Sequence, residues 1–201
     1  MSPDHYFSVE PQTDHKTQLF TAQVRGVEME FFTDRGVFSK NKLDRGTRLL
    51  LDTIQVPPEG SCLDLGCGYG PIGLFMAKKA PQATVYMVDI NQRAVDLARA
   101  NLARNGVRAH VYQGNGLEPL AGIRFDCIAC NPPYRAGRAT VMALLTSAYA
   151  ALKPGGILYI VGRTAQGIKT LARLLEEELG SCREAAKGGG FRVFTVEKPP
   201  V

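Results

Sequence analysis

The chain changes from strand to helix at Leu63-Asp64-Leu65-Gly66-Cys67-Gly68-Tyr69-Gly70-Pro71-Ile72-Gly73. A mostly apolar run leads into alternate glycines, and Pro71 follows them at a position suited to the first turn of a helix. Glycine permits a sharp turn and lets a ligand approach the main chain closely. Such a turn is typical of the ligand site of open α/β sheets, which lies at the carboxyl ends of the strands.

Strand-like and helix-like segments alternate from residue 61 onward. The predicted strands are 61–65, 84–89, 109–112, 124–130 and 156–161, and the predicted helices are 71–80, 91–105, 136–151 and 165–179. This alternation predicts a Rossmann-like α/β fold with helices on both faces of a parallel sheet. The end of the chain differs, because Cys182–Lys187 and Phe191–Glu197 are both strand-like and only three glycines separate them. We therefore expect a seven-stranded, mostly parallel sheet with one antiparallel strand.

The segment before this core has another pattern. Leu19–Val24 and Val27–Phe32 are strand-like, and the two residues between them predict a β-hairpin. Leu43–Ile54 is helical and ends before Pro57. We expect a single domain over residues 1–201, with a hairpin and helix extension at 1–58 and a catalytic core at 59–201.

The composition excludes a disordered tail, a collagen-like fibre and a disulfide miniprotein. Hydrophobic residues make up 45% of the 201 residues and charged residues 21%, which is ordinary for a globular domain. The chain shows no apolar run of about 18 residues and no signal-peptide pattern, so we expect no membrane partner. Five scattered cysteines fit reduced thiols in the cytoplasm. Cys127 and Cys130 have metal-ligand spacing, but residues three apart in a strand face opposite sides, so we expect no metal site.

A second acidic residue, Asp89, ends the next predicted strand, where a carboxylate can accept from both ribose hydroxyls. Gly68-x-Gly70-x-x-Gly73 also satisfies the dinucleotide fingerprint, which keeps an NAD-dependent oxidoreductase as an alternative. Asp64, two residues before Gly66, favours a different cofactor from the dinucleotide.

Asp-x-Gly-x-Gly-x-Gly resembles motif I of the class I S-adenosyl-L-methionine (SAM) methyltransferases. The resemblance implies SAM as the cofactor, with its methionine portion at the loop, its ribose at Asp89 and its adenine against Ile90. The family usually has an acidic residue after the third strand for the adenine amino group. Here that position is Asn115, whose carbonyl can accept from an amine. The implied cofactor-binding residues of the core are Asp64, Gly66, Cys67, Gly68, Gly70, Asp89, Ile90, Asn115 and Asn131.

The turn after the predicted strand at 124–130 is Asn131-Pro132-Pro133-Tyr134. Two prolines predict a rigid, extended turn, which aims the Asn131 side chain and the Pro132 carbonyl into the cleft. Both groups are acceptors. A planar conjugated amine is a poor nucleophile, and accepting both of its protons frees the nitrogen lone pair for in-line methyl transfer. The ring of Tyr134 offers a face on which a base can stack.

This turn resembles motif IV of the amino-group methyltransferases, whose substrates are the adenine N6 amine, the guanine N2 amine and the glutamine amide. The stretches Gly36–Lys40 and Leu43–Leu51 resemble the methyltransferase small domain, which includes the small-subunit rRNA guanine-N2 methyltransferases. The chain is similar to the compact, single-domain members of that family. Within it, Phe38 and Thr47 are implied to lie against the cofactor. The resemblance implies a SAM-dependent N-methyltransferase of RNA, acting on guanine N2 of 16S rRNA, with catalytic residues Asn131, Pro132, Pro133 and Tyr134.

Basic residues flank the predicted cleft, and the whole chain carries a net charge of +5. A cluster of this kind can bind phosphates with little sequence preference. We expect ribosomal RNA or the small ribosomal subunit as the partner. The candidate RNA-binding residues are Arg35, Lys40, Lys42, Arg45, Arg48, Arg135 and Arg138.

Other interpretations of the same motifs stay open. A protein glutamine N5 methyltransferase shares the Asn131–Tyr134 turn, although the release-factor enzymes carry a helical domain before motif I. A DNA or RNA adenine N6 methyltransferase shares it too, and the restriction enzymes add a target-recognition domain. An NAD-dependent oxidoreductase would need hydride-handling residues that are not evident. A non-catalytic RNA-binding module would have no need of paired acceptors.

Overall fold

The structure, a computed structural model, describes residues 18–33 and 42–200. Within these ranges the strands are β1 (Gln18–Val24), β2 (Val27–Thr33), β3 (Glu59–Leu65), β4 (Gln82–Asp89), β5 (His110–Gln113), β6 (Phe125–Cys130), β7 (Leu152–Arg163), β8 (Arg183–Gly188) and β9 (Phe191–Glu197). The helices are α1 (Arg45–Thr53), α2 (Pro71–Lys79), α3 (Gln92–Arg104), α4 (Arg138–Ala150) and α5 (Ile168–Leu179). Short 3-10 turns lie at η1 (Glu118–Leu120), η2 (Tyr134–Ala136) and η3 (Thr164–Gln166).

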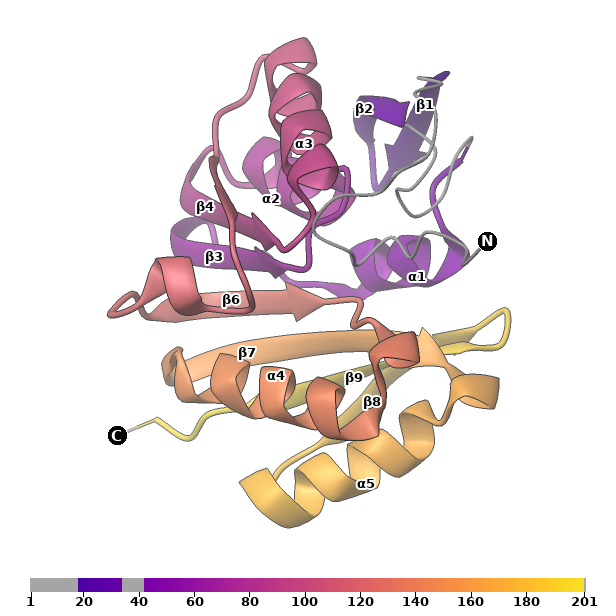
Figure 1. The fold of residues 1–201 in the computed structure, drawn as a ribbon, viewed down its shortest axis with the longest axis vertical. Helices are drawn as coiled ribbons and strands as arrows, with labels where there is room; N and C mark the ends of the chain where they lie inside the picture. Colours follow the sequence, from indigo (N-terminus) through magenta and orange to yellow (C-terminus); the bar gives the residue numbers. More distant parts are fainter. Residues whose placement is uncertain (1–17, 34–41, 201) are drawn as a thin grey trace.

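Seven strands form one sheet in the order β5-β4-β3-β6-β7-β9-β8. Neighbours from β5 through β7 pair in parallel, whereas β9 runs antiparallel to both β7 and β8. The predicted Rossmann-like α/β fold with one antiparallel strand is therefore confirmed. Figure 1 shows β3, β4 and β6 ending at the same edge of the sheet, which is where the glycine-rich turn and the Asn-Pro-Pro turn begin.

The sheet separates two hydrophobic cores. Side chains of β3 alternate between them: Cys62 joins the core with α1, α2 and α3, and Leu63 joins the core with α4 and α5. The two cysteines of β6 divide in the same way, since Cys127 lies in the first core and Cys130 in the second. Opposite faces exclude a shared metal ion, as the strand period predicts. All five cysteines of the chain are free thiols.

The hairpin of β1 and β2 turns at Arg25-Gly26, both with positive φ (49° and 79°), as a two-residue turn requires. It docks on α3 through asparagine side chains that pair with the edge of β2. Asn101 Oδ1 accepts from the N–H of Phe32 at 2.7 Å, and its Nδ2 donates to the carbonyl of Phe32 at 2.9 Å. Asn105 pairs with the main chain of Glu30 in the same way. The hairpin is thus attached to the core by backbone-like hydrogen bonds.

Helix α1 is anchored at both ends. The side chain of Asp44 caps its N-terminus and accepts from the N–H of Thr47 at 2.9 Å. At its C-terminus, Arg25 Nη1 donates to the carbonyl of Ile54 at 2.7 Å. A Cβ on Gly46 would meet the ring of Phe191 at 2.7 Å, so glycine lets α1 pack closely on β9. These contacts place the N-terminus of α1 beside the carboxyl ends of the central strands (Figure 1).

The observed elements differ from the predicted ones mainly at their ends. Strand β7 begins at Leu152 rather than 156, because the chain pairs with Phe125 of β6 before a register shift. The three 3-10 turns were not predicted, since single turns carry little periodicity. In the described ranges, no helix is both long and apolar enough to cross a bilayer, and no acidic, cysteine or histidine side chains gather in a group that could hold a metal ion.

Candidate active site

The glycine-rich loop after β3 has the conformation that its sequence predicts. Gly66, Gly68 and Gly70 all adopt positive φ, at 73°, 56° and 96°. Other residues adopt such angles only with strain, which accounts for glycine at these three positions. The N–H groups of Gly66 and Cys67 both donate to the carbonyl of Val88 at 2.9 Å. A Cβ on Gly66 or Gly68 would meet nothing within 4 Å, so this side of the loop is open to a ligand.

Asp64 lies beneath the loop and is fully buried. Its Oδ2 accepts from the N–H of Gly73 at 2.7 Å, which supplies a cap that the N-cap residue of α2, Gly70, cannot provide. Its Oδ1 is buried and has no hydrogen-bond partner within the described parts of the chain. Burial raises the pKa of the Asp64 carboxyl to about 7, and the charge of Asp89 adds to the shift. A buried acceptor without a donor fits an incoming cation or N–H group.

Asp89 connects the end of β4 to the glycine loop. Its Oδ2 accepts from the N–H of Gly68 at 2.8 Å, and its Oδ1 accepts from the N–H of Asn91 at 2.9 Å. Burial raises the pKa of the carboxyl, and these backbone hydrogen bonds oppose the shift. Each carboxylate oxygen keeps a further lone pair, so both can still accept from a diol.

A cleft joins the loop, β4, α1 and the turn after β6. Its lining residues are Thr47, Gly66, Cys67, Gly68, Tyr69, Pro71, Ile72, Asp89, Ala94 and Asn131. The cleft has a volume of about 60 Å³, so a nucleoside-sized ligand would extend beyond it. This arrangement fits SAM. The carboxylate of Asp89 suits its ribose, and the open face of the glycines, above the unpartnered oxygen of Asp64, suits its ammonium group.

The cleft brings together Thr47, Gly66, Cys67, Gly68, Asp89 and Asn131 of the predicted cofactor-binding set. Gly70 is buried, where a Cβ would meet Met87 at 2.8 Å, so it serves packing. Asn115 is exposed after β5, and neither it nor Ile90 lines the cleft; Asp64 is buried beneath the loop and does not line it either. Phe38 lies outside the described residues.

Sequence reasoning missed Tyr69, Pro71, Ile72 and Ala94, which also line the cleft. Three of them lie within or directly after the run of glycines, so their position in the loop was the available signal. Ala94 had none, because a small apolar residue in the first turn of α3 is indistinguishable from a packing residue.

The Asn131–Tyr134 turn presents two acceptors whose other contacts are within the protein. Asn131 is half-buried, and its Nδ2 lies 3.5 Å from Asp44 Oδ2 and 3.4 Å from Thr47 Oγ1 at the N-terminus of α1. The carbonyl of Pro132 accepts from the N–H of Tyr134 at 2.9 Å. Pro133 between them has φ −76° and ψ 78°, the geometry of an inverse γ-turn. One lone pair of the Pro132 carbonyl remains for a further donor.

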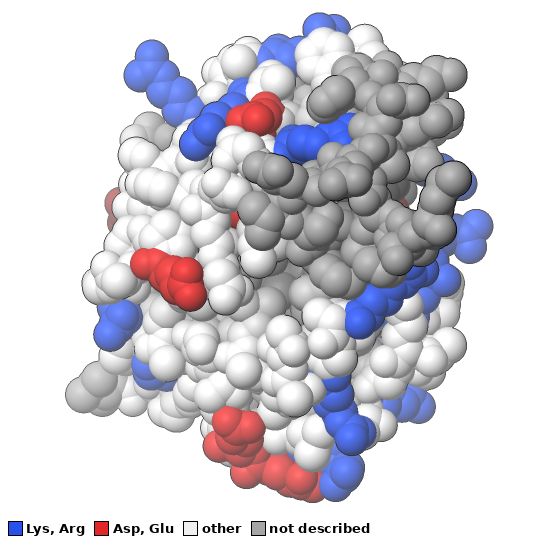
Figure 2. Space-filling view, in the orientation of Figure 1, with Lys and Arg blue, Asp and Glu red and all other residues white. Residues whose placement is uncertain are grey.

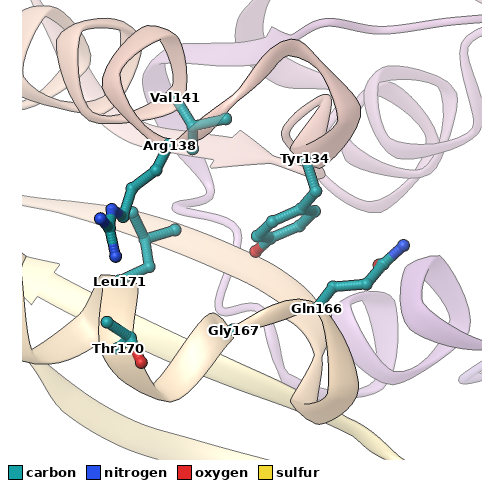
Figure 3. Close-up of a pocket in the computed structure, with 7 residues that line it drawn as sticks. All are labelled: Tyr134, Arg138, Val141, Gln166, Gly167, Thr170 and Leu171. Carbon is teal, nitrogen blue, oxygen red and sulfur yellow. The ribbon is translucent and has the colours of Figure 1, made fainter.

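The ring of Tyr134 packs against the core with α4 and α5, on the face of the sheet opposite to α1, α2 and α3. Its hydroxyl donates to the carbonyl of Val161 at 3.0 Å, and a Cβ on Gly162 would clash with the hydroxyl. Burial raises the pKa of the phenol, with the Cys130 thiol as a second cause, so the hydroxyl stays a donor. The ring borders a cavity of about 290 Å³ between α4 and α5. Figure 3 shows the ring and the guanidinium of Arg138 on opposite sides of this cavity.

The predicted basic residues lie on two sides of the site. Lys42, Arg45 and Arg48 are exposed and line a groove of about 470 Å³ between β1, α1 and the turn from β8 to β9. Arg135 and Arg138 are exposed just after the Asn-Pro-Pro turn. Figure 2 shows basic side chains along the edge near α1, whereas acidic side chains gather over α5 at the opposite end. Arg35 and Lys40 lie outside the described residues.

Comparison with known proteins gives consistent matches. The methyltransferase small domain family matches residues 28–195. The uncharacterized protein YbxB of Bacillus subtilis (strain 168) is 36% identical over 198 residues, which cover 97% of this chain and 98% of YbxB. Ribosomal RNA small subunit methyltransferase C of Ectopseudomonas mendocina (strain ymp) is 34% identical over 192 residues, or 94% of this chain and 57% of that enzyme.

Among solved structures, the 16S rRNA N2 methyltransferase RsmC of T. thermophilus, in complex with AdoMet and guanosine, is 32% identical with a TM-score of 0.80. The match covers 94% of this chain and 52% of that one. The chain therefore spans nearly all of YbxB but only about half the length of the two RNA methyltransferases.

Proposed function

Because this chain belongs to the methyltransferase small domain family, we propose that it transfers a methyl group from SAM to the N2 amine of guanine in 16S rRNA. The observation that carries the proposal is the Asn-Pro-Pro turn, whose Asn131 lines the same cleft as the glycine loop and Asp89. The relatives named as small-subunit rRNA methyltransferases support the choice of guanine N2. The site itself supports an exocyclic amine as the acceptor of the methyl group, through the acceptors of the Asn-Pro-Pro turn.

The chain's residues prepare the amine for attack. When bound, SAM supplies an electrophilic methyl group. Asn131 Oδ1 and the Pro132 carbonyl accept hydrogen bonds from the two amine N–H groups, which draws the nitrogen out of conjugation and frees its lone pair. The nitrogen–methyl bond would form as the bond from the methyl group to the sulfonium sulfur breaks, and one N–H proton would be released to water. Both acceptors are held by protein contacts before any ligand arrives, so little reorganisation is needed. Asp89 and the glycine loop would hold the ribose and methionine ends of the cofactor, and the buried carboxylate of Asp64 beneath the loop would favour its ammonium.

The cavity beside Tyr134 is the proposed site of the base. Its volume of about 290 Å³ suits a nucleobase, and Val141 and Leu171 add apolar walls to the aromatic ring. Tyr134 directly follows the acceptor turn in the chain, and its hydroxyl holds the ring on the carbonyl of Val161.

The groove lined by Lys42, Arg45 and Arg48, together with Arg135 and Arg138, is the proposed contact surface for the RNA backbone. These exposed cations lie on both sides of the site, which suits a strand that passes across its mouth. We also propose that residues 1–201 act as one domain. The packing of α1 on β7 and β9 and of β2 on α2 and α3 supports this.

Nucleoside analysis of ribosomal RNA tests the proposed function. RNA from cells that lack the gene, incubated with the purified protein and labelled SAM, should gain N2-methylguanosine in the small-subunit RNA. RNA from cells that carry the gene should accept little label. Label on a peptide that contains the Gly-Gly-Gln segment of release factors, with none on RNA, would instead establish a glutamine methyltransferase.

A further inference from the structure

We infer that Asp44 is a positioning residue that sets the orientation of the Asn131 amide. The inference rests on the proposed function, because it concerns which atom of Asn131 meets the substrate amine. Asp44 and Asn131 are 87 residues apart in the chain, and Asp44 Oδ2 lies 3.5 Å from Asn131 Nδ2.

The orientation matters because an amide side chain has two different ends. An amine that is to be activated must meet an acceptor, and only the carbonyl end of Asn131 can accept. If the amide were rotated by half a turn, its NH₂ would face the amine, and two donors would oppose each other. A catalytic asparagine therefore needs a neighbour that distinguishes its two ends.

Asp44 is such a neighbour because a carboxylate can only accept. With the NH₂ of Asn131 toward α1, Asp44 Oδ2 and Thr47 Oγ1 can both accept from it, at 3.5 and 3.4 Å. In the rotated state, the carbonyl oxygen of Asn131 would face the carboxylate oxygen instead. That contact is repulsive, so the carbonyl stays directed away from α1.

The carboxylate is itself held in place. Asp44 Oδ2 accepts from the N–H of Thr47 at 2.9 Å as the N-cap of α1. Gly46 lets α1 pack closely on Phe191, and Arg25 holds the other end of the helix. The capping interaction of a structural helix thus also serves the reacting group.

The substitution Asp44→Ser separates capping from orientation. Serine caps a helix about as well as aspartate, so stability should change little. Its hydroxyl can donate as well as accept, so it no longer favours one end of the amide. We expect the single-turnover rate of methyl transfer to fall by about tenfold to a hundredfold, while the Kd for SAM stays within about twofold of the wild-type value.

The double variant gives the decisive comparison. With Asn131→Ala already present, Asp44→Ser should reduce the rate no further, because the amide on which it acts is gone. A purely structural role would instead lower the rate by the same factor in both backgrounds. Thr53→Ala is the matched control, since it removes a hydrogen bond of 2.7 Å to the Leu49 carbonyl in the last turn of α1, away from Asp44, and should leave the rate nearly unchanged.

A second readout does not depend on methyl transfer. In the NMR spectrum, the side-chain NH₂ signals of Asn131, identified by their loss in Asn131→Ala, should exchange slowly with water in the wild type and faster in Asp44→Ser. Unchanged exchange together with an unchanged rate would overturn the role of Asp44. A wild-type protein that transfers no methyl group to RNA, yet shows this change in exchange, would overturn the proposed function and leave the inference intact.

Discussion

At the scale of single residues, the site is built from acceptors whose other interactions are already made. Asp89 binds two backbone N–H groups, and the Pro132 carbonyl binds one. Asp64 differs, because only one of its oxygens has a partner among the described residues. Asp89 lines the cleft, whereas Asp64 is buried beneath the loop with one oxygen that still lacks a donor.

The raised pKa of Asp64 predicts a pH dependence of SAM binding. Its pKa is about 7 in the folded protein, so the carboxyl is neutral at lower pH and charged at higher pH. A charged carboxylate favours a cationic ligand. The affinity for SAM should therefore weaken by up to about tenfold per pH unit below pH 7 and level off above it.

Calorimetric titration between pH 5.5 and 8.5 measures this dependence. The variant Asp64→Asn is the control, because it has no proton to exchange and should bind SAM weakly with a nearly flat profile. A wild-type profile as flat as that of the variant would contradict the assignment of Asp64 to the ammonium.

At the scale of elements, α3 carries two functions on separate turns. Its N-terminus adjoins Asp89, whereas Asn101 holds β2 and also donates to the carbonyl of Tyr69 in the glycine loop at 2.8 Å. One buried amide thus links the hairpin to the wall of the cofactor cleft. The hairpin contributes to the site through this link, although its strands do not lie at the reacting groups.

The variant Asn101→Ala should destabilise the protein by about 2–4 kcal/mol, because it removes three hydrogen bonds from a fully buried position. Urea unfolding followed by circular dichroism measures the change. The matched control is Gln92→Ala, at the first position of the same helix, where the side chain makes an exposed hydrogen bond to Asp96. Its free energy of unfolding should lie within about 0.5 kcal/mol of the wild-type value. Equal stability of the two variants would exclude a structural role for Asn101.

The parts of the site that depend on residues near one another in the sequence were predictable, whereas contacts between distant segments were not. The sharp turn at Gly66, Gly68 and Gly70 was predictable because a run of alternate glycines indicates backbone with positive φ, which depends only on local sequence. The turn at Asn-Pro-Pro followed from residue type and position, and its acceptor role stays a prediction. The contact between Asp44 and Asn131 was not predictable, because it arises only when α1 packs on the sheet. The direction of the Tyr134 ring likewise depends on Val161 and Gly162, which belong to another strand.

At the scale of the whole molecule, charge is distributed unevenly around a site of modest size. The net charge is +5, and exposed basic residues of α1 line a groove beside the cleft. The acidic residues of α5 lie at the far end (Figure 2). This arrangement favours the approach of a polyanion with the active-site edge leading.

The salt dependence of RNA binding tests this arrangement. The double variant Arg45→Ala/Arg48→Ala should lower the slope of log K against log salt by about 0.7 for each phosphate of single-stranded RNA that the variant no longer neutralises. Arg173→Ala, which removes a cation paired with Glu177 on α5, should leave the slope unchanged. Filter binding at several salt concentrations measures both, and equal slopes for the two variants would place the RNA elsewhere.

Activation of the amine is tested most directly by the single-turnover rate of methyl transfer by Asn131→Ala to small-subunit RNA, measured beside its affinity for SAM. If the Asn131 carbonyl and the Pro132 carbonyl together activate the amine, the variant should bind SAM within about twofold of the wild type and lose roughly a hundredfold or more in rate. The methyl group transferred by the wild type should be found on N2 of guanine. A variant that transfers methyl groups as fast as the wild type, or a wild-type product methylated on a ribose hydroxyl, would contradict this mechanism.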